Sequence, residues 1–160
     1  MSWSSRHLMG TLCLVLLPAL TCIAASADEM RTYRKVAGYD DVLFELNNAI
    51  LERGLTIHSH GEIASMLERT GPAVGSSKPI YAKADFINFC SAKLSRQLMD
   101  AEATNLGYCP FGVFIYAAAA LPGTVVVGYR RPTIAGSEAG QAALRDLDAL
   151  LDGIVRAALQ

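Results

Sequence analysis

Residues 111–118 read FGVFIYAA and residues 124–129 read TVVVGY, two short segments rich in aromatic and β-branched side chains. Such side chains favour extended chain, because they pack well on a pleated surface. Leu121-Pro122-Gly123, which lies between the segments, has the composition of a turn. This stretch predicts a β-hairpin, and the elements on either side of it have to extend or cover the sheet that it starts.

A long amphipathic helix is predicted after the hairpin. Arg130-Arg131-Pro132 ends the second strand, and from Ser137 onward apolar residues recur at three- and four-residue spacing. We expect this helix to cover one face of the sheet with the side that carries Leu144, Leu147, Leu151, Ile154, Val155 and Ala158.

Upstream of the hairpin, the same periodicities predict a strand, a helix and a second strand. Residues 31–36 alternate as a short strand, and residues 41–53 have helical spacing that ends at Gly54. Residues 55–60 alternate again. Because side chains alternate between the two faces of a strand, we expect Ile57 on the core face, with His58 and His60 together on the other face.

The middle of the chain is less regular. Residues 63–69 predict a short helix, and the glycine- and proline-containing stretch after it predicts a loop. Residues 80–90 alternate imperfectly, and the change of phase near Phe86 suggests a bulge or a turn between two short strands. Residues 92–101 predict a further helix.

This order of elements predicts a two-layer α+β fold, with a mainly antiparallel sheet of about five strands and helices packed on one face. That arrangement buries every apolar stripe described above. A wholly parallel sheet would need a crossover at each step, which the order of elements lacks.

Three stretches of the chain resemble the domain-of-unknown-function family 302. They are FINFCSA at residues 86–92, NLGYCPF at residues 105–111 and GTVVVGYRRP at residues 123–132, and the resemblance runs from about Tyr33 to Pro132. It implies a TATA-binding-protein-like order of strand, helix, four strands and helix, often in a dimer. It carries no catalytic residue across, and the fold name implies no DNA binding.

The first residues have the three-part order of a secretory signal peptide. A weakly positive start precedes an apolar run from Leu8 to Ile23, and Ala25-Ser26-Ala27 supplies the small residues of a cleavage site. We therefore expect residues 1–27 to be a signal peptide and residues 28–160 to form one domain that is periplasmic or secreted. Contact with a membrane is expected only through an uncleaved or lipidated N-terminus.

The charge pattern argues against nucleic acid as a partner. Among the 160 residues the formal net charge is −1, with no basic stretch that could neutralise phosphates. We expect the partner to be a small molecule or a protein, which includes a second copy of the chain in a homodimer. The sequence specifies no cofactor.

Cys90 and Cys109 remain after signal removal, in a compartment where disulfides persist. If the two strands that they flank are antiparallel neighbours, both cysteines lie at the same end of the sheet and a disulfide is feasible. A parallel crossover would separate them by a strand length. Three interpretations stay open: a structural disulfide, two thiols, or a redox or metal role.

His58 and His60 could supply two metal ligands, with a cysteine or Asp85 completing a tetrahedral site. A solvated strand face is the alternative, since two ligands alone specify no metal. Aromatic residues in the predicted strands could line a ligand pocket or fill the core. The candidates for ligand binding are Tyr108, Phe111, Tyr116 and, for an anion at the end of the sheet, Arg130.

The sequence favours a binding module over an enzyme. No hydrolase nucleophile motif, spaced acidic pair or phosphate loop is present. We expect an exported module that binds a small ligand or a protein against its sheet, stabilised by a Cys90–Cys109 disulfide. The alternative is a periplasmic redox or metal-binding accessory protein that uses Cys90, Cys109, His58 and His60.

Overall fold

Five strands form one sheet in the order β1-β5-β4-β3-β2, and every neighbouring pair is antiparallel. The computed structural model describes residues 29–76 and 78–160. The predicted hairpin and the predicted α+β fold class are both confirmed. The strands are β1 Met30–Val36, β2 Thr56–Glu62, β3 Tyr81–Cys90, β4 Phe111–Ala118 and β5 Thr124–Arg130.

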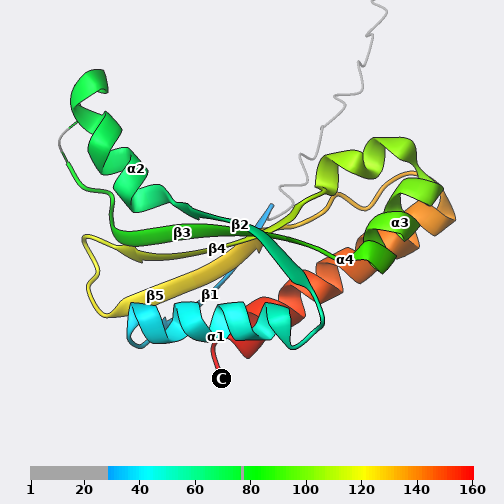
Figure 1. Ribbon diagram of the computed structural model, residues 1–160, viewed down its shortest axis with the longest axis horizontal. Coiled ribbons are helices and arrows are strands. Elements are labelled where there is room, and N and C mark those ends of the chain that lie inside the picture. The colour runs from blue at the N-terminus through cyan, green and yellow to red at the C-terminus, as the bar shows by residue number, and fades with distance from the viewer. Residues whose placement is uncertain (1–28, 77) are drawn as a thin grey trace, which may run out of the picture.

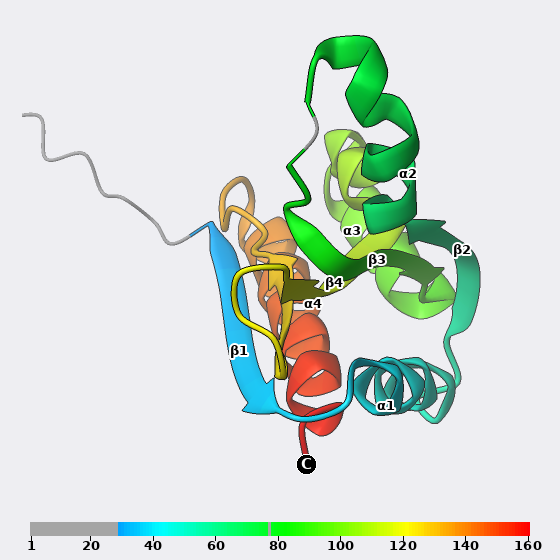
Figure 2. The ribbon, with the colours of Figure 1, turned by 90° about the vertical axis from the view of Figure 1, so that its left-hand side faces the viewer.

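Helices α1 and α4 lie side by side under one face of the sheet, and α3 packs against α4 (Figures 1 and 2). Helix α2 instead projects away from the body of the domain. The helices are α1 Tyr39–Leu51, α2 Ile63–Thr70, α3 Ala92–Ala101 and α4 Glu138–Ala157, with 3-10 turns η1 Gly71–Val74 and η2 Ala103–Tyr108.

The core lies between the sheet and helices α1 and α4. Strand β4 alternates buried and half-buried residues, and its core face carries Phe111, Val113 and Ile115. Leu46 of α1 and Ile154 of α4 are both completely buried against this layer. Burying a side chain of this size stabilises the fold by about 1.5–3 kcal/mol. The apolar faces of α1 and α4 therefore pack on the sheet, as the spacing of their apolar residues predicts.

Serine side chains cap the N-termini of two helices, α3 and α4. The Ser137 Oγ accepts a hydrogen bond from the Gly140 N–H at 3.1 Å, and the Ser91 Oγ accepts one from the Leu94 N–H at 3.3 Å. Such caps satisfy backbone donors that the first helical turn leaves open. The predicted start of the long C-terminal helix at Ser137 is therefore confirmed.

Strand β3 is one continuous strand, so the prediction of a break near Phe86 is wrong. The irregularity in its pairing with β4 falls between Tyr81 and Lys83. Residues 84–89 pair with β4 without interruption.

Strand β2 contains a bulge that overturns the expected placement of the two histidines. Ile57 pairs with Phe89 and Ser59 with Asn88, so one residue, His58, is left without a partner on β3. An extra residue shifts every later side chain to the opposite face. His60 therefore pairs with the buried Ile87 and lies on the helix side of the sheet. The prediction that His58 and His60 share a face is wrong.

Aromatic rings cover part of the sheet face opposite helices α1 and α4. A Cβ placed on Gly112 would lie 2.4 Å from the Phe86 ring, and one on Gly128 would lie 2.7 Å from the Phe114 ring. Each ring therefore lies across a glycine of the next strand. This packing leaves Phe86 and Phe114 half-buried on a face that no helix covers.

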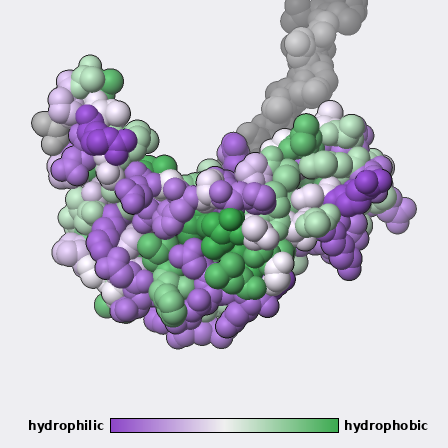
Figure 3. Space-filling model, viewed as in Figure 1, coloured by the Kyte–Doolittle hydropathy of each residue, from purple (hydrophilic) through white to green (hydrophobic). Residues whose placement is uncertain are grey.

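Residues 63–74, which form α2 and η1, make up an arm that projects from the sheet. We call it the α2 arm. None of the side chains in α2 is buried, and the arm contacts mainly β3 (Figure 1). In the space-filling view the arm stands out from the body, where apolar side chains gather beside β2 and α1 (Figure 3).

Candidate functional site

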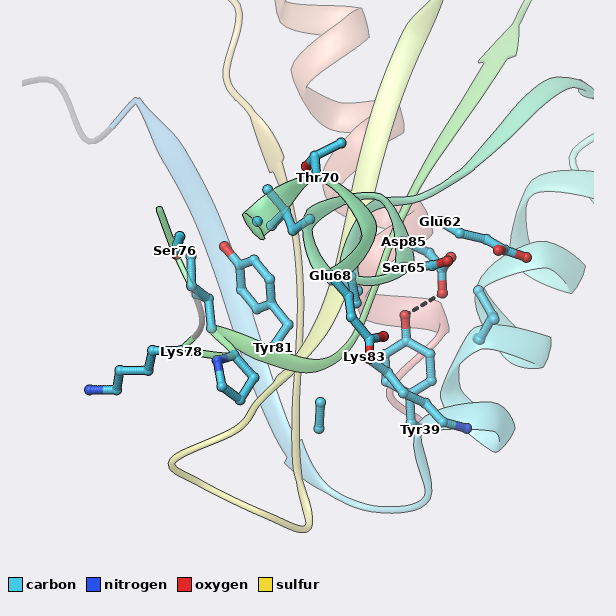
Figure 4. A pocket seen from close by; sticks show the side chains of 18 of the residues that line it. Tyr39, Glu62, Ser65, Glu68, Thr70, Ser76, Lys78, Tyr81, Lys83 and Asp85 are labelled. Carbon is cyan, nitrogen blue, oxygen red and sulfur yellow. Dashed lines mark hydrogen bonds between the residues drawn. The ribbon is translucent and has the colours of Figure 1, made fainter. Parts of the chain in front are cut away.

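A cleft of about 1010 Å³ lies at the foot of the α2 arm. Its walls come from the arm, the first half of β3, the end of β2 and the start of α1 (Figure 4). Apolar residues of the arm and of the segment before β3 form one wall, among them Leu67, Pro72 and Ile80. The cleft is thus the place where the projecting arm leaves the sheet open to a ligand.

Asp85 is the centre of a polar group in this cleft. Its Oδ2 accepts a hydrogen bond of 2.5 Å from the Tyr39 hydroxyl, and its Oδ1 lies 3.0 Å from the His60 Nε2. Only 12% of the Asp85 side chain is exposed, whereas His60 is 39% exposed. The bulge in β2 brings His60 to this position, because it turns His60 toward the helix side.

Tyr39 is held in its protonated form. Burial, followed by the hydrogen bond to Asp85, raises the pKa of the Tyr39 hydroxyl well above its usual range. The hydroxyl therefore stays a donor to Asp85 at every physiological pH. Helix α1 places it there, since Tyr39 is the first residue of that helix.

Lys83 lies beside this group on the same strand. Its Nζ is 2.7 Å from both carboxylate oxygens of Asp40 and 5.4 Å from the centroid of the Tyr39 ring. The Lys83–Asp40 pair is exposed, so it contributes little to stability. It does place an ammonium group over an aromatic ring at the edge of the cleft.

An aromatic row connects the cleft to the open face of the sheet. Tyr81 lines the cleft, and its ring lies 5.3 Å from that of Tyr116. Tyr116 in turn stacks on Phe114 at 6.3 Å with an interplanar angle of 20°. Tyr116, a candidate from the sequence, therefore lies next to the cleft without lining it.

The other three aromatic or basic candidates are not brought together. Phe111 is only 2% exposed and packs in the core, which is one of the two alternatives that the sequence left open for the aromatic residues. The Tyr108 hydroxyl accepts a hydrogen bond from the Thr133 N–H at 3.3 Å, beyond the opposite end of the sheet. Arg130 forms an exposed ion pair with Glu29.

Cys90 and Cys109, by contrast, are neighbours. Their Sγ atoms lie 3.4 Å apart as two thiols, and the Ser95 Oγ lies 3.7 Å from the Cys109 Sγ. Burial, and then the contact with Cys109, raise the pKa of the Cys90 thiol to about 11. A thiol with such a pKa is a poor nucleophile at neutral pH, because the thiolate is the reactive form.

The histidines do not build a metal site with their neighbours. His60 contacts Asp85, while His58 is the unpaired residue of the bulge. Across residues 29–76 and 78–160, no three histidine, cysteine or acidic side chains converge as metal ligands would.

Sequence reasoning missed Tyr39, Lys83 and the α2 arm as parts of a site. A signal for the arm was present. β2 and β3 are adjacent antiparallel strands, yet residues 63–80 connect them where a hairpin needs only two to five residues. Long connections of this kind are frequently functional. No comparable signal marks Tyr39, since only the fold brings it to Asp85.

Within the part of the chain that the structure describes, no helix has the length and apolar character needed to cross a membrane. The predicted signal peptide, residues 1–27, lies outside the described residues.

Comparison with known proteins identifies the fold. Residues 31–158 match the model of a family described as domain of unknown function DUF302. A crystal structure of an uncharacterized conserved DUF302 protein from Bacillus stearothermophilus superposes with a TM-score of 0.68 at 13% sequence identity. The superposition covers 82% of this chain and 99% of that one. No curated protein matches the chain.

Proposed function

Because this chain belongs to the DUF302 family, whose name assigns no activity, we propose its function from its own cleft: it is an exported module that binds a small ligand at the foot of the α2 arm. The observation that carries this proposal is a cleft of about 1010 Å³ that is lined both by apolar side chains and by the polar group around Asp85. Ligand sites in proteins combine these two features, at volumes of roughly 300–1,000 Å³.

The arrangement of the polar group supports binding. Tyr39 fixes one oxygen of Asp85 and His60 lies at the other, so the polar atoms are positioned before a ligand arrives. A preformed site avoids the cost of ordering side chains on binding. The half-exposed His60 imidazole then supplies a further polar contact toward the cleft.

A small molecule fits this cleft better than a segment of folded protein. Standard protein interfaces bury about 800 Å² per partner, over roughly 20–30 residues a side. The cleft instead lies in the angle between the arm and β3, where it can enclose a compact ligand.

A second element of the proposal is a stabilising disulfide between Cys90 and Cys109. The 3.4 Å separation of the sulfur atoms supports it, because the two atoms are already in contact and only about 1.4 Å beyond the length of a disulfide bond. Export supports it too, since disulfides persist outside the cytoplasm.

The alternative of a redox protein draws on the same pair of thiols. The spacing of the pair disfavours it, because redox dithiols of the thioredoxin type are separated by two residues beside a helix N-terminus, whereas Cys90 and Cys109 are 19 positions apart. A structural bond is therefore the better interpretation of this pair.

Ligand-observed NMR with a library of small fragments tests the binding proposal. We expect fragments that bind the wild type to lose binding in Ala82→Trp, which places a large ring in the cleft from an exposed position on β3. The matched control is Ala73→Trp, an exposed position on the arm outside the cleft lining. Fragments that bind both variants equally well would contradict the proposal, as would the absence of any binding fragment.

The intact mass of protein from the exported fraction tests export. We expect the loss of residues 1–27 and, before reduction, no uptake of an alkylating reagent by Cys90 or Cys109. A full-length mass in the cytoplasmic fraction would contradict export, and alkylation of the unreduced protein would contradict the disulfide.

A further inference from the structure

We propose that the ligand of the cleft is a small organic cation with an aromatic or aliphatic body, such as an arylalkylamine. This inference rests on the proposed function, because it names the class of ligand for the same cleft. Three features of the cleft carry it: its charge, its aromatic rings and its apolar wall.

The charge of the cleft is predominantly negative. Four carboxylates line it, against two lysines and one histidine. Lys83 is already bound by Asp40, whereas Glu62 and Glu68 form no ion pair with any described residue. Lys78 is the lining lysine without a carboxylate partner among those residues. An added cation would therefore find carboxylates that the protein itself has not neutralised.

The aromatic rings of the cleft offer a second attraction to a cation. The Lys83 ammonium already lies 5.4 Å from the centre of the Tyr39 ring, within the range of cation–π contacts. Tyr81 lines the cleft with a second ring, which packs against Tyr116 and against no lysine or arginine of residues 29–76 and 78–160. A ligand cation at Tyr81 would reproduce the contact that the protein makes at Tyr39.

The apolar side chains of the cleft are the reason for expecting an apolar body in the ligand. Leu67 and Ile80 line the cleft with 36% and 61% of their surfaces exposed. An inorganic cation would leave this surface in water. A ligand with an apolar body covers it, and its removal from water is favourable in proportion to the area buried.

Calorimetry with three ligands of similar shape tests the inference. Phenethylamine is cationic, phenethyl alcohol is neutral and hydrocinnamate is anionic, and all three carry the same aromatic body. At low ionic strength we expect phenethylamine to bind at least about tenfold more tightly than the other two. In Glu62→Gln/Glu68→Gln its affinity should fall to within about twofold of that of the alcohol.

The matched control is Glu45→Gln/Glu52→Gln, which removes the same charge from an exposed position of α1 and from the exposed residue that follows the helix, both outside the cleft, and should leave all three affinities unchanged. Equal or tighter binding of the alcohol or of hydrocinnamate would overturn the cationic class and leave the ligand cleft standing. Failure of all three ligands to bind would also overturn the cationic class, and the fragment screen would then decide whether the cleft binds any ligand.

Discussion

The Sγ atoms of Cys90 and Cys109 lie 3.4 Å apart although the two residues are 19 positions apart in the chain. The sheet explains this proximity. β3 and β4 are antiparallel neighbours with Phe89 opposite Phe111, so the segment between them leaves and re-enters the sheet at one end. A disulfide here would join the two ends of the segment that contains α3 and connects β3 to β4.

Oxidation of this pair is expected to stabilise the fold by about 3 kcal/mol, the loop-closure value for a loop of roughly 20 residues. Urea unfolding with and without a reductant measures the difference. The double variant Cys90→Ser/Cys109→Ser should unfold at the same urea concentration in both conditions. An unchanged midpoint for wild-type protein whose mass proves it oxidised would contradict the prediction.

In the reduced protein, Cys90 should react slowly. Because burial and the contact with Cys109 raise the pKa of its thiol to about 11, the thiol stays protonated through the neutral range. At pH 7.5 we expect alkylation about two orders of magnitude slower than for a model peptide with an ordinary thiol pKa near 8.5. The rate should keep rising to at least pH 10, and a plateau below pH 9 would contradict this assignment.

Local patterns in the sequence predict much of this fold. The hairpin at residues 111–130 and the helix that begins after Ser137 follow from side chains next to each other in the chain, which is why both predictions are confirmed. The proximity of the two cysteines depended on one additional fact, the antiparallel order of β3 and β4. The order of elements favoured that topology, and the structure has it.

The candidate site was harder to predict, because it depends on contacts between distant elements. Strict alternation placed His60 away from the core, and only the bulge at His58 turns it toward Asp85. Phe111 was a candidate for ligand binding or for the core, because aromatic residues in strands can serve either role. Its register, opposite Phe89 on the core face, decides the matter.

Two glycines on the open face of the sheet offer a matched test of how closely the aromatic rings pack on the neighbouring strands. Gly112→Ala meets the end of the Phe86 ring, which can turn away on an exposed face, whereas Gly128→Ala also meets the Arg31 carbonyl oxygen at 2.5 Å. A backbone atom held in a strand ladder cannot move so easily. We expect Gly128→Ala to lower the free energy of unfolding by about 2 kcal/mol and Gly112→Ala by less than about 1 kcal/mol. Urea unfolding measures both, and equal losses would contradict the prediction.

Two carboxylates on α4 should make stability depend on acid pH. Burial alone would raise the pKa values of Asp148 and Asp152, but hydrogen bonds outweigh it and lower both. Asp148 accepts from Arg131 and Tyr129, and Asp152 from Tyr33 and Arg156. Both pKa values are lower in the folded chain, so the stabilisation is present above the unfolded value near 4 and is lost as the pH falls below it.

The double variant Asp148→Asn/Asp152→Asn should therefore be less stable at pH 7 and should show a flatter fall in stability between about pH 5 and pH 2. The urea midpoint at each pH measures this. Curves for wild type and variant that run parallel across the acid range would mean that other groups carry the dependence.

The central claim is that the cleft at the foot of the α2 arm binds a ligand, and amide chemical shifts recorded during titration with the tightest fragment test it most directly. We predict saturable shifts in α2 and in the first half of β3, around Leu67 and Asp85, with little change at α3. Shifts confined to the far end of the sheet near Tyr108, or no saturable shifts at all, would contradict the claim.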